Sequence, residues 1–215
     1  MHKGKDFTLG PLLDITALLE TPRVVLMDLE LTCWEDSLRT GWADPLRPPE
    51  VLEIGLALYD VETQDVISTF SSLIRPTINP TLSEYCRSLL TITQQDVDLA
   101  KPLAAVAEDI ATWERRFAVA DAPTCTWCTL DREWLHDDAR RSNCVDPFDG
   151  RRHVNLSSLL MKALGEDTGK TPPRDAMTAR LGLPPIPDRH RALPDAVDLA
   201  RFCALLSTPH GLRRP

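Results

Sequence analysis

The stretch that decides the fold is Arg23-Val-Val-Leu-Met-Asp-Leu-Glu-Leu31. It is almost continuously apolar, which is typical of a strand that is buried on both faces at the centre of a sheet. Two acidic residues interrupt it, Asp28 and Glu30. Because side chains two residues apart on a strand project from the same face, both carboxylates point the same way out of an apolar run. The segment therefore predicts a central strand that carries a pair of acidic groups.

Strand-like and helical patterns follow this segment in a definite order. Residues 51–60 and 66–75 are two further strand-like runs, and the three runs together predict an antiparallel meander. The spacing of the apolar residues then changes to that of helices, with short strands between them. We expect short strands at 124–130 and 153–156, and helices at 11–20, 82–90, 102–117, 131–141, 157–164, 175–181 and 193–206. This order predicts an α/β layered domain.

The composition is that of a single globular domain. The 215 residues are 43% hydrophobic and 26% charged, which is enough to bury a core without disulfides or a structural metal. We expect an N-terminal arm at 1–22, the domain at 23–207 and a C-terminal tail at 208–215. The net charge of −8 excludes a basic coat that binds nucleic acid by bulk electrostatics. Carboxylates that hold divalent cations still permit a substrate that carries phosphate.

The distribution of apolar residues and cysteines bears on the compartment. No apolar run approaches the roughly 20 residues of a membrane span, so no membrane partner is expected. The first residues lack the apolar run of a secretory signal, which favours a cytoplasmic protein with reduced thiols. Cys125 and Cys128 form a CxxC, but no second pair stands at the spacing of a zinc finger, so zinc is not expected.

The acidic pair of the first strand indicates a metal site. Two like charges side by side in a buried setting repel each other and raise each other's pKa unless a cation neutralises them. Hard carboxylate oxygens select magnesium or manganese rather than zinc. The alternative is that Asp28 and Glu30 lie at a strand end and are simply solvated.

Three further polar residues stand at places that suit a site. Asp131 follows the expected strand at 124–130, where a plain helix N-cap is the alternative role. His190 and Asp195 lie five residues apart at the start of the last helix, and Pro194 fits its first turn. The positive end of that helix favours the ionised form of Asp195. For His190, the alternative is an idle, solvent-exposed imidazole in a Pro-rich loop.

The order of these residues resembles that of the DEDDh 3′-to-5′ exonucleases of the DnaQ-like, RNase T superfamily: Asp-x-Glu, then Asp, then His-x4-Asp. Within that family the chain looks most like the branch of the enhanced-RNAi exonucleases and the inhibitor-of-KinA-pathway proteins. The segments that carry this likeness are Asp28-Leu-Glu-Leu-Thr-Cys-Trp34, Glu50-Val-Leu-Glu-Ile-Gly55 and the stretch 74–93. The resemblance covers residues 23–206 and implies an RNase H-like fold, with a mixed five-stranded sheet flanked by helices. A Gly-Trp-Ala-Asp stretch in the loop 35–48 is one departure that the resemblance does not interpret.

The resemblance also implies a mechanism with two divalent ions, Mg²⁺ or Mn²⁺, that clamp the scissile phosphate. Asp28 would bridge both ions, Glu30 and Asp195 would complete one, and Asp131 would hold the second. His190 would take the proton from the attacking water, since histidine changes its charge near neutral pH. Further substrate contacts are expected from Leu29, Thr32, Trp34 and Arg189, with phosphate contacts from Arg151, Arg152 and Arg191. For Leu29 and Trp34, packing against the core is the alternative.

The expected activity is removal of nucleoside 5′-monophosphates from the free 3′ end of single-stranded RNA or short oligonucleotides, with the chain acting alone or as a homodimer. One alternative is a proofreading subunit that acts on DNA. Another is a non-enzymatic module that uses the same fold for regulation or interaction. All five positions of the motif are present, which favours an active enzyme.

Overall fold

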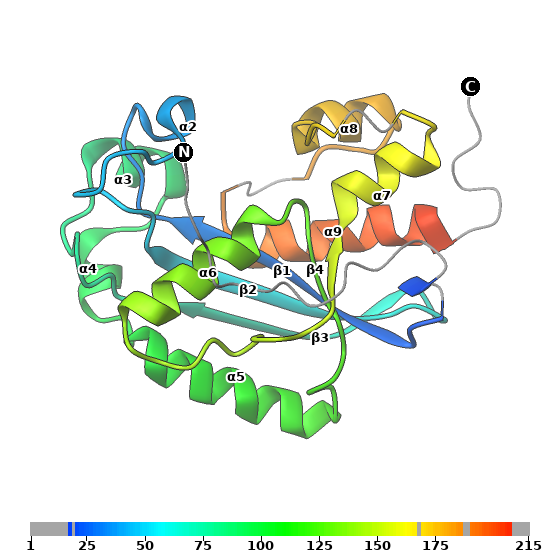
Figure 1. The fold of residues 1–215 in the computed structure, drawn as a ribbon, viewed down its shortest axis with the longest axis horizontal. Helices are drawn as coiled ribbons and strands as arrows, with labels where there is room; N and C mark the ends of the chain where they lie inside the picture. The colour runs from blue at the N-terminus through cyan, green and yellow to red at the C-terminus, as the bar shows by residue number, and fades with distance from the viewer. Residues whose placement is uncertain (1–16, 19, 167–168, 187–189, 208–215) are drawn as a thin grey trace.

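A mixed five-stranded sheet runs through the centre of the computed structural model, which describes residues 17–18, 20–166, 169–186 and 190–207 (Figure 1). The strands lie in the order β3-β2-β1-β4-β5. Their bounds are Arg23–Leu31 for β1, Val51–Asp60 for β2, Asp65–Leu73 for β3, Thr124–Thr126 for β4 and His153–Asn155 for β5. β1, β2 and β3 pair antiparallel, whereas β4 runs parallel to β1 and β5 parallel to β4. The expected meander and the five-stranded mixed sheet are confirmed.

Helices cover both faces of this sheet (Figure 1). On one face, α7, α8 and α9 pack against Val24 and Leu26 of β1. On the other face, α5 and α6 pack against Val25 and Met27 of the same strand. The bounds are Ser37–Thr40 for α2, Glu84–Leu90 for α3, Gln94–Asp98 for α4, Leu103–Phe117 for α5, Leu130–Arg141 for α6, Leu156–Ala163 for α7, Arg174–Arg180 for α8 and Ala192–Ser207 for α9. Because faces alternate along β1, Asp28 and Glu30 lie on the face that α9 covers.

Three expectations about local structure were wrong. The strand expected to reach residue 130 ends at Thr126, because the Thr126 hydroxyl donates to the Cys128 carbonyl and the chain turns there. α2 lies in a segment that was expected to be a loop. α4 was also missed, although Thr93 and Asp96 form a capping box at its start.

The remaining expectations concern membrane-spanning helices, the cysteines and the two ends of the chain. Within the described residues, no helix is both long and apolar enough to cross a membrane. All six cysteines are free thiols. The expected helix at 11–20 falls largely outside the described residues, but Leu18 is buried in the core beside β1. The tail at 208–215 lies outside the described residues.

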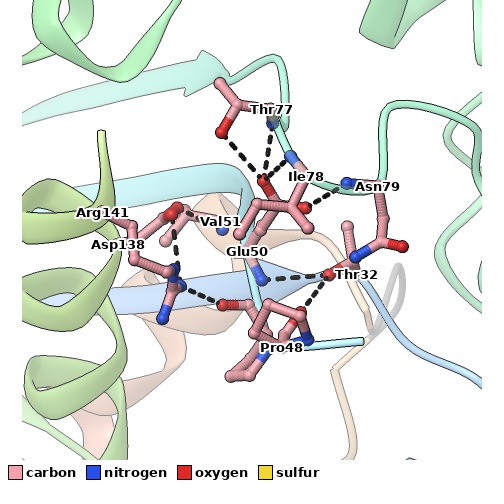
Figure 2. Close-up of polar contacts among 10 residues, drawn as sticks. Thr32, Pro48, Glu50, Val51, Thr77, Ile78, Asn79, Asp138 and Arg141 are labelled. Carbon is pink, nitrogen blue, oxygen red and sulfur yellow. Dashed lines mark hydrogen bonds and ion pairs between the residues drawn. The ribbon is translucent and has the colours of Figure 1, made fainter. Parts of the chain in front are cut away.

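The start of β2 ties the surrounding loops to the sheet (Figure 2). The buried Glu50 carboxylate accepts hydrogen bonds from the backbone N–H groups of residues 77–79 at 2.6–2.7 Å. The Glu50 N–H donates to the Thr32 hydroxyl at 3.0 Å, and the Val51 N–H donates to Asp138 of α6 at 2.8 Å. Hydrogen bonds to ionised carboxylates are stronger than neutral ones, so these contacts hold both α6 and the loop before α3 against β2.

The close approach of α9 to the sheet depends on Gly55. This residue pairs with Asp28 across β1 and β2. A Cβ atom at Gly55 would lie only 2.2–2.4 Å from backbone atoms of Ala192 and Leu193, at the start of α9. No rotamer change can relieve a clash with backbone, so glycine is required here for the first turn of α9 to lie over Asp28.

We expect Gly55→Ala to lower the free energy of unfolding by about 3 kcal/mol, at the upper end of the range for overpacked sites. Chemical denaturation of the variant and the unchanged protein measures this difference. Thr69→Ala on the exposed side of β3 is the control and should change the free energy by less than about 0.5 kcal/mol. A Gly55→Ala variant as stable as that control would mean that α9 does not depend on this close approach.

Candidate active site

Four acidic residues expected from the sequence form a group that we call the acidic site: Asp28, Glu30, Asp131 and Asp195. In Asp28, Glu30 and Asp195, one carboxylate oxygen each lies within 4.8 Å of the others. Glu30 is 8% and Asp195 is 2% exposed. The structure thus brings together side chains from β1 and from the first turn of α9, which are more than 160 positions apart in the chain.

Asp131 reaches the same site from the first turn of α6. The N-cap of this helix is Thr129, so the alternative role of Asp131 as a plain N-cap is wrong. Its carboxylate interacts electrostatically with those of Asp28 and Glu30. Asp131 therefore faces the other acids, although it is not part of their closest group.

The electrostatics of the acidic site call for a cation. Burial, with the neighbouring carboxylates of Asp131, Glu30 and Asp195, raises the pKa of Asp28 well above its ordinary value. Burial and the carboxylates of Asp195 and Glu53 raise the pKa of Glu30 to about 8. Burial raises the pKa of Asp131 to about 7. Acids in this state either hold protons or bind a positive partner. A set of hard carboxylate oxygens at this spacing fits a divalent ion such as Mg²⁺ or Mn²⁺.

His190 lies beside these acids with an exposed side chain. Its backbone N–H donates to Asp195 Oδ2 at 3.1 Å, and its φ angle of 66° is left-handed. A left-handed non-glycine residue stores strain that the surrounding structure must hold, and such residues cluster at functional sites. The main chain of His190 is therefore anchored to the acidic site, while its imidazole stands at the edge of an adjoining cavity.

An ion pair between β2 and the start of α9 holds this region in place. Arg191 donates to the Glu53 carboxylate through Nε at 2.9 Å and through an NH2 group at 2.8 Å. The Ala192 N–H donates to the same carboxylate at 3.1 Å. Glu53 is buried and pairs with Glu30 across the strands. The expected phosphate contact of Arg191 is thus replaced by a structural role, because its guanidinium joins the start of α9 to Glu53 of the sheet.

Arg174, the first residue of α8, lies inside the acidic site. An NH2 group of its guanidinium is 2.5 Å from Asp195 Oδ1, and the other is 3.3 Å from Asp28 Oδ1. The group that contacts Asp28 also donates to the backbone carbonyl of Asp195 at 3.1 Å. The side chain is 9% exposed. Sequence reasoning missed this residue.

An apolar cavity of about 240 Å³ opens next to Glu30 and His190. Trp42 and Trp134 form one wall, with ring centroids 5.2 Å apart and planes inclined by 57°. Leu38 of α2 is 78% exposed at its edge. The remaining lining residues are Leu29, Leu31, Cys33, Ser37, Tyr85, Leu89 and Leu90. Its shape and its aromatic wall suit a flat, apolar group of a ligand.

Trp42 explains the Gly-Trp-Ala-Asp stretch. Gly41 and Trp42 both have left-handed backbone, with φ of 62° and 53°, and this turn directs the indole back toward β1. The Trp42 Nε1–H donates to the Thr32 carbonyl at 2.8 Å. The other tryptophan of the cavity wall, Trp134, stands three positions after Asp131 on α6. That spacing places two side chains on one helix face, and it is the signal that could have identified Trp134 from the sequence.

The expected substrate contacts have different outcomes. Leu29 packs in the core and also lines the cavity, so both roles that were considered for it are compatible with its position. The expected substrate contact of Thr32 is corrected by the structure. Thr32 is buried, and its hydroxyl accepts from the Glu50 N–H and donates to the Pro48 carbonyl. Trp34 lies under the Arg47 guanidinium, 5.4 Å from the ring centroid, and is not part of the cavity wall. Arg189 lies outside the described residues.

The expected phosphate contact of Arg151 is also corrected by the structure. Its guanidinium pairs with Glu114 at 2.7 Å and donates to the Val119 carbonyl at 2.8 Å. Arg152 lines a surface hollow together with Arg23 and Asp60. Arg23 and Asp60 lie at the end of the β1–β2 pair opposite to Glu30, so this hollow is remote from the acidic site.

Comparisons with known proteins agree with this geometry. The exonuclease family model RNase T matches residues 25–202. The 3′-5′ exonuclease eri1 of Schizosaccharomyces pombe is 33% identical over 93 residues, which are 43% of this chain and 29% of that protein. The 3′-5′ exonuclease Snipper of Drosophila melanogaster is 33% identical over 137 residues, 64% of this chain and 38% of that protein. The chain thus spans well under half the length of both relatives.

Among solved structures, the nuclease domain of 3′hExo, a DEDDh family member bound to rAMP, superposes with a TM-score of 0.77. The sequence identity is 24%, and the superposition covers 90% of this chain and 96% of that one. The fold is therefore that of the RNase H-like exonucleases. The chain belongs to the RNase T exonuclease family, and its expected resemblance to the DEDDh 3′-to-5′ exonucleases of the enhanced-RNAi branch is confirmed.

Proposed function

We propose that this chain is a metal-dependent 3′-to-5′ exonuclease that acts on single-stranded RNA, with residues 23–207 as its catalytic domain. The observation that carries the proposal is the convergence of Asp28, Glu30 and Asp195 within 4.8 Å, next to an exposed histidine and an apolar cavity. The family of the chain and the ribonucleotide bound to the nuclease domain of 3′hExo support it.

Each acid has a role that follows from its position. Asp28, Glu30 and Asp195 would hold one divalent ion, and Asp131, which interacts electrostatically with Asp28, would help to hold a second ion. When bound, such ions neutralise charge that develops on the phosphate and make water a better nucleophile at neutral pH. His190 would accept the proton of the attacking water, because its imidazole is exposed beside Glu30 and free to approach a substrate. The products would be a nucleoside 5′-monophosphate and a chain shortened by one residue.

The cavity supplies a reason for a single-stranded substrate. A base can enter the space between Trp42, Trp134 and Leu38 only when it is unpaired, since paired bases are covered by their neighbours in the helix. Stacking of a base on an aromatic side chain contributes about 1–3 kcal/mol and does not depend strongly on which base it is. The position beside Glu30 and His190 means that the base held there belongs to the nucleotide being removed.

The test uses labelled RNA and DNA oligomers of the same sequence, incubated with the purified protein and Mn²⁺. We expect stepwise shortening of RNA from its 3′ end, with release of 5′-monophosphates. A 3′-terminal phosphate should slow the reaction strongly, because it adds charge and bulk to the terminal nucleotide. Equal degradation of a circular RNA would contradict an exonuclease, and faster degradation of DNA would contradict the preference for RNA.

A second prediction concerns metal and pH. A carboxyl group whose pKa is raised on folding binds its proton more tightly in the folded protein than in the unfolded chain. With Glu30 raised from 4.5 to about 8 and Asp131 from 3.8 to about 7, the free energy of unfolding in chelator should fall as pH rises through that window. Mn²⁺ should abolish the fall, because it replaces the protons.

Thermal unfolding at pH 6 and pH 9, with chelator or with Mn²⁺, measures this effect, and activity in the same buffers should vanish with chelator. The comparison between the two buffers cancels the contribution of groups elsewhere in the chain. Full activity in chelator, or restoration by Zn²⁺ alone, would contradict the proposed metal requirement.

A third prediction separates the acids from the histidine. Asp28→Asn removes a metal ligand without changing its size, so Mn²⁺ binding and turnover should both be lost, turnover by on the order of 10³-fold or more. His190→Asn should leave Mn²⁺ binding intact and lower turnover by roughly 10²–10⁴-fold, as for a lost general base. Asparagine tolerates the left-handed backbone at this position and keeps the N–H that Asp195 accepts.

Calorimetric titration with Mn²⁺ and single-turnover rates as a function of pH measure the two properties. Asp109→Asn is the matched control, since Asp109 is an exposed carboxylate on α5 that pairs with Lys101. If His190→Asn has the same single-turnover rate as the unchanged protein at neutral pH, His190 is not the base.

A further inference from the structure

The feature that the proposed chemistry does not use is Arg174. Its two NH2 groups contact Asp195 Oδ1 at 2.5 Å and Asp28 Oδ1 at 3.3 Å. These carboxylates are two of the three that lie close enough together to hold one ion. A buried guanidinium therefore already neutralises part of the negative charge of the acidic site.

The position of Arg174 is built into the fold. The carbonyl of Pro172, two residues before it, accepts the Trp127 Nε1–H at 2.9 Å. Trp127 packs on Phe202 of α9, with ring centroids 5.0 Å apart. On the other side, Met177 of α8 is buried in the core. The start of α8 is thus held by contacts on both sides, and the guanidinium is directed at the acidic site rather than at solvent.

The charges around Arg174 match a cation that compensates the acids. Burial opposes its charged form, but Asp28, Asp195, Asp198 and Asp131 together raise its pKa above the ordinary value. A planar guanidinium suits two carboxylates at once, because its N–H groups form a fork. Without a positive partner, the same carboxylates would face one another in a buried site at a large cost.

We propose that Arg174 is the counter-ion of the metal-free acidic site and that divalent ions displace its guanidinium when they bind. This inference rests on the proposed metal requirement. The guanidinium and an ion held by Asp28, Glu30 and Asp195 need two of the same carboxylates, those of Asp28 and Asp195. Two cations that share ligands also repel each other, so one has to leave for the other to bind. Metal loading is then an exchange of cations, and Arg174 sets the metal concentration at which the acidic site fills.

The test measures Mn²⁺ binding and stability of Arg174→Gln, which removes the charge and keeps most of the volume. By linkage, a residue that stabilises only the metal-free protein must weaken metal binding. The variant should therefore have a lower melting temperature in chelator, a nearly unchanged one in saturating Mn²⁺, and a Kd for Mn²⁺ lower by on the order of tenfold. Titrations at pH 9 limit competition by protons.

Two further variants define the effect. Arg174→Lys keeps the charge but loses the fork, so its Kd for Mn²⁺ should lie between those of Arg174→Gln and the unchanged protein. Arg180→Gln is the matched control: it lies on the same helix, is exposed, and pairs with Glu166. Its Kd should be unchanged.

One measurement is made on the unchanged protein, and a variant serves only to assign its signal. In the unchanged protein, the side-chain N–H signal of Arg174, identified by its loss in Arg174→Lys, should shift and lose protection from exchange during a Mg²⁺ titration. A signal that stays in place while Mg²⁺ binds would overturn the exchange.

The other outcomes are also decisive. Equal losses of stability in chelator and in Mn²⁺ would show that Arg174 only docks α8, and a larger loss in Mn²⁺ would show that it supports the loaded site. Either result overturns the inference and leaves the proposed nuclease intact. If the unchanged protein does not bind Mn²⁺ at all, the proposed metal requirement fails first, and the exchange fails with it.

Discussion

Mutual repulsion among carboxylates is the constraint on which this structure depends. Asp28, Glu30 and Asp195 have oxygens within 4.8 Å of one another in a largely buried site, which no local sequence preference would produce. The surrounding fold holds these carboxylates close together against their mutual repulsion. Alternation along β1 fixes two of them on one face, and Gly55 lets α9 come close enough to deliver the third. Bringing like charges together costs free energy. Such a cost is typical of sites that are organised to bind a charged ligand rather than to stabilise the fold.

A second set of buried charges keeps this assembly rigid. Glu53 holds Arg191 and the first N–H of α9, while Glu50 holds the loop before α3 through three backbone N–H groups. Asp138 ties α6 to the Val51 N–H (Figure 2). Each of these three carboxylates accepts a hydrogen bond from at least one backbone N–H group. Glu50 and Glu53, at the start of β2 and within it, are therefore structural, whereas Asp28 and Glu30 of β1 face a site that needs a cation.

Local patterns and long-range contacts differed in how well the sequence revealed them. The bounds of β1 and β2 follow directly from their apolar runs, because a strand in the middle of a sheet is buried on both faces along its length. The five positions of the motif could be named because their types and order are distinctive. The capping box of α4 and the spacing of Asp131 and Trp134 were readable signals that were not used. Arg174 gave no such signal: it meets Asp28 across 146 positions, and nothing near it in the sequence marks a charge that will be buried.

The architecture also separates the parts of the site that must stay from the part that must move. The acids come from a central strand and two helix starts, and their main chains are held by the sheet and by the Glu53–Arg191 pair. His190 shares that anchorage only through its backbone N–H, and its side chain stands at the mouth of the cavity. A group that accepts a proton has to adapt to the position of the reacting water, whereas ligands of an ion gain from being held in advance. An anchored backbone with an exposed imidazole meets both demands at one residue, and the left-handed φ of His190 is the conformation that makes this arrangement possible.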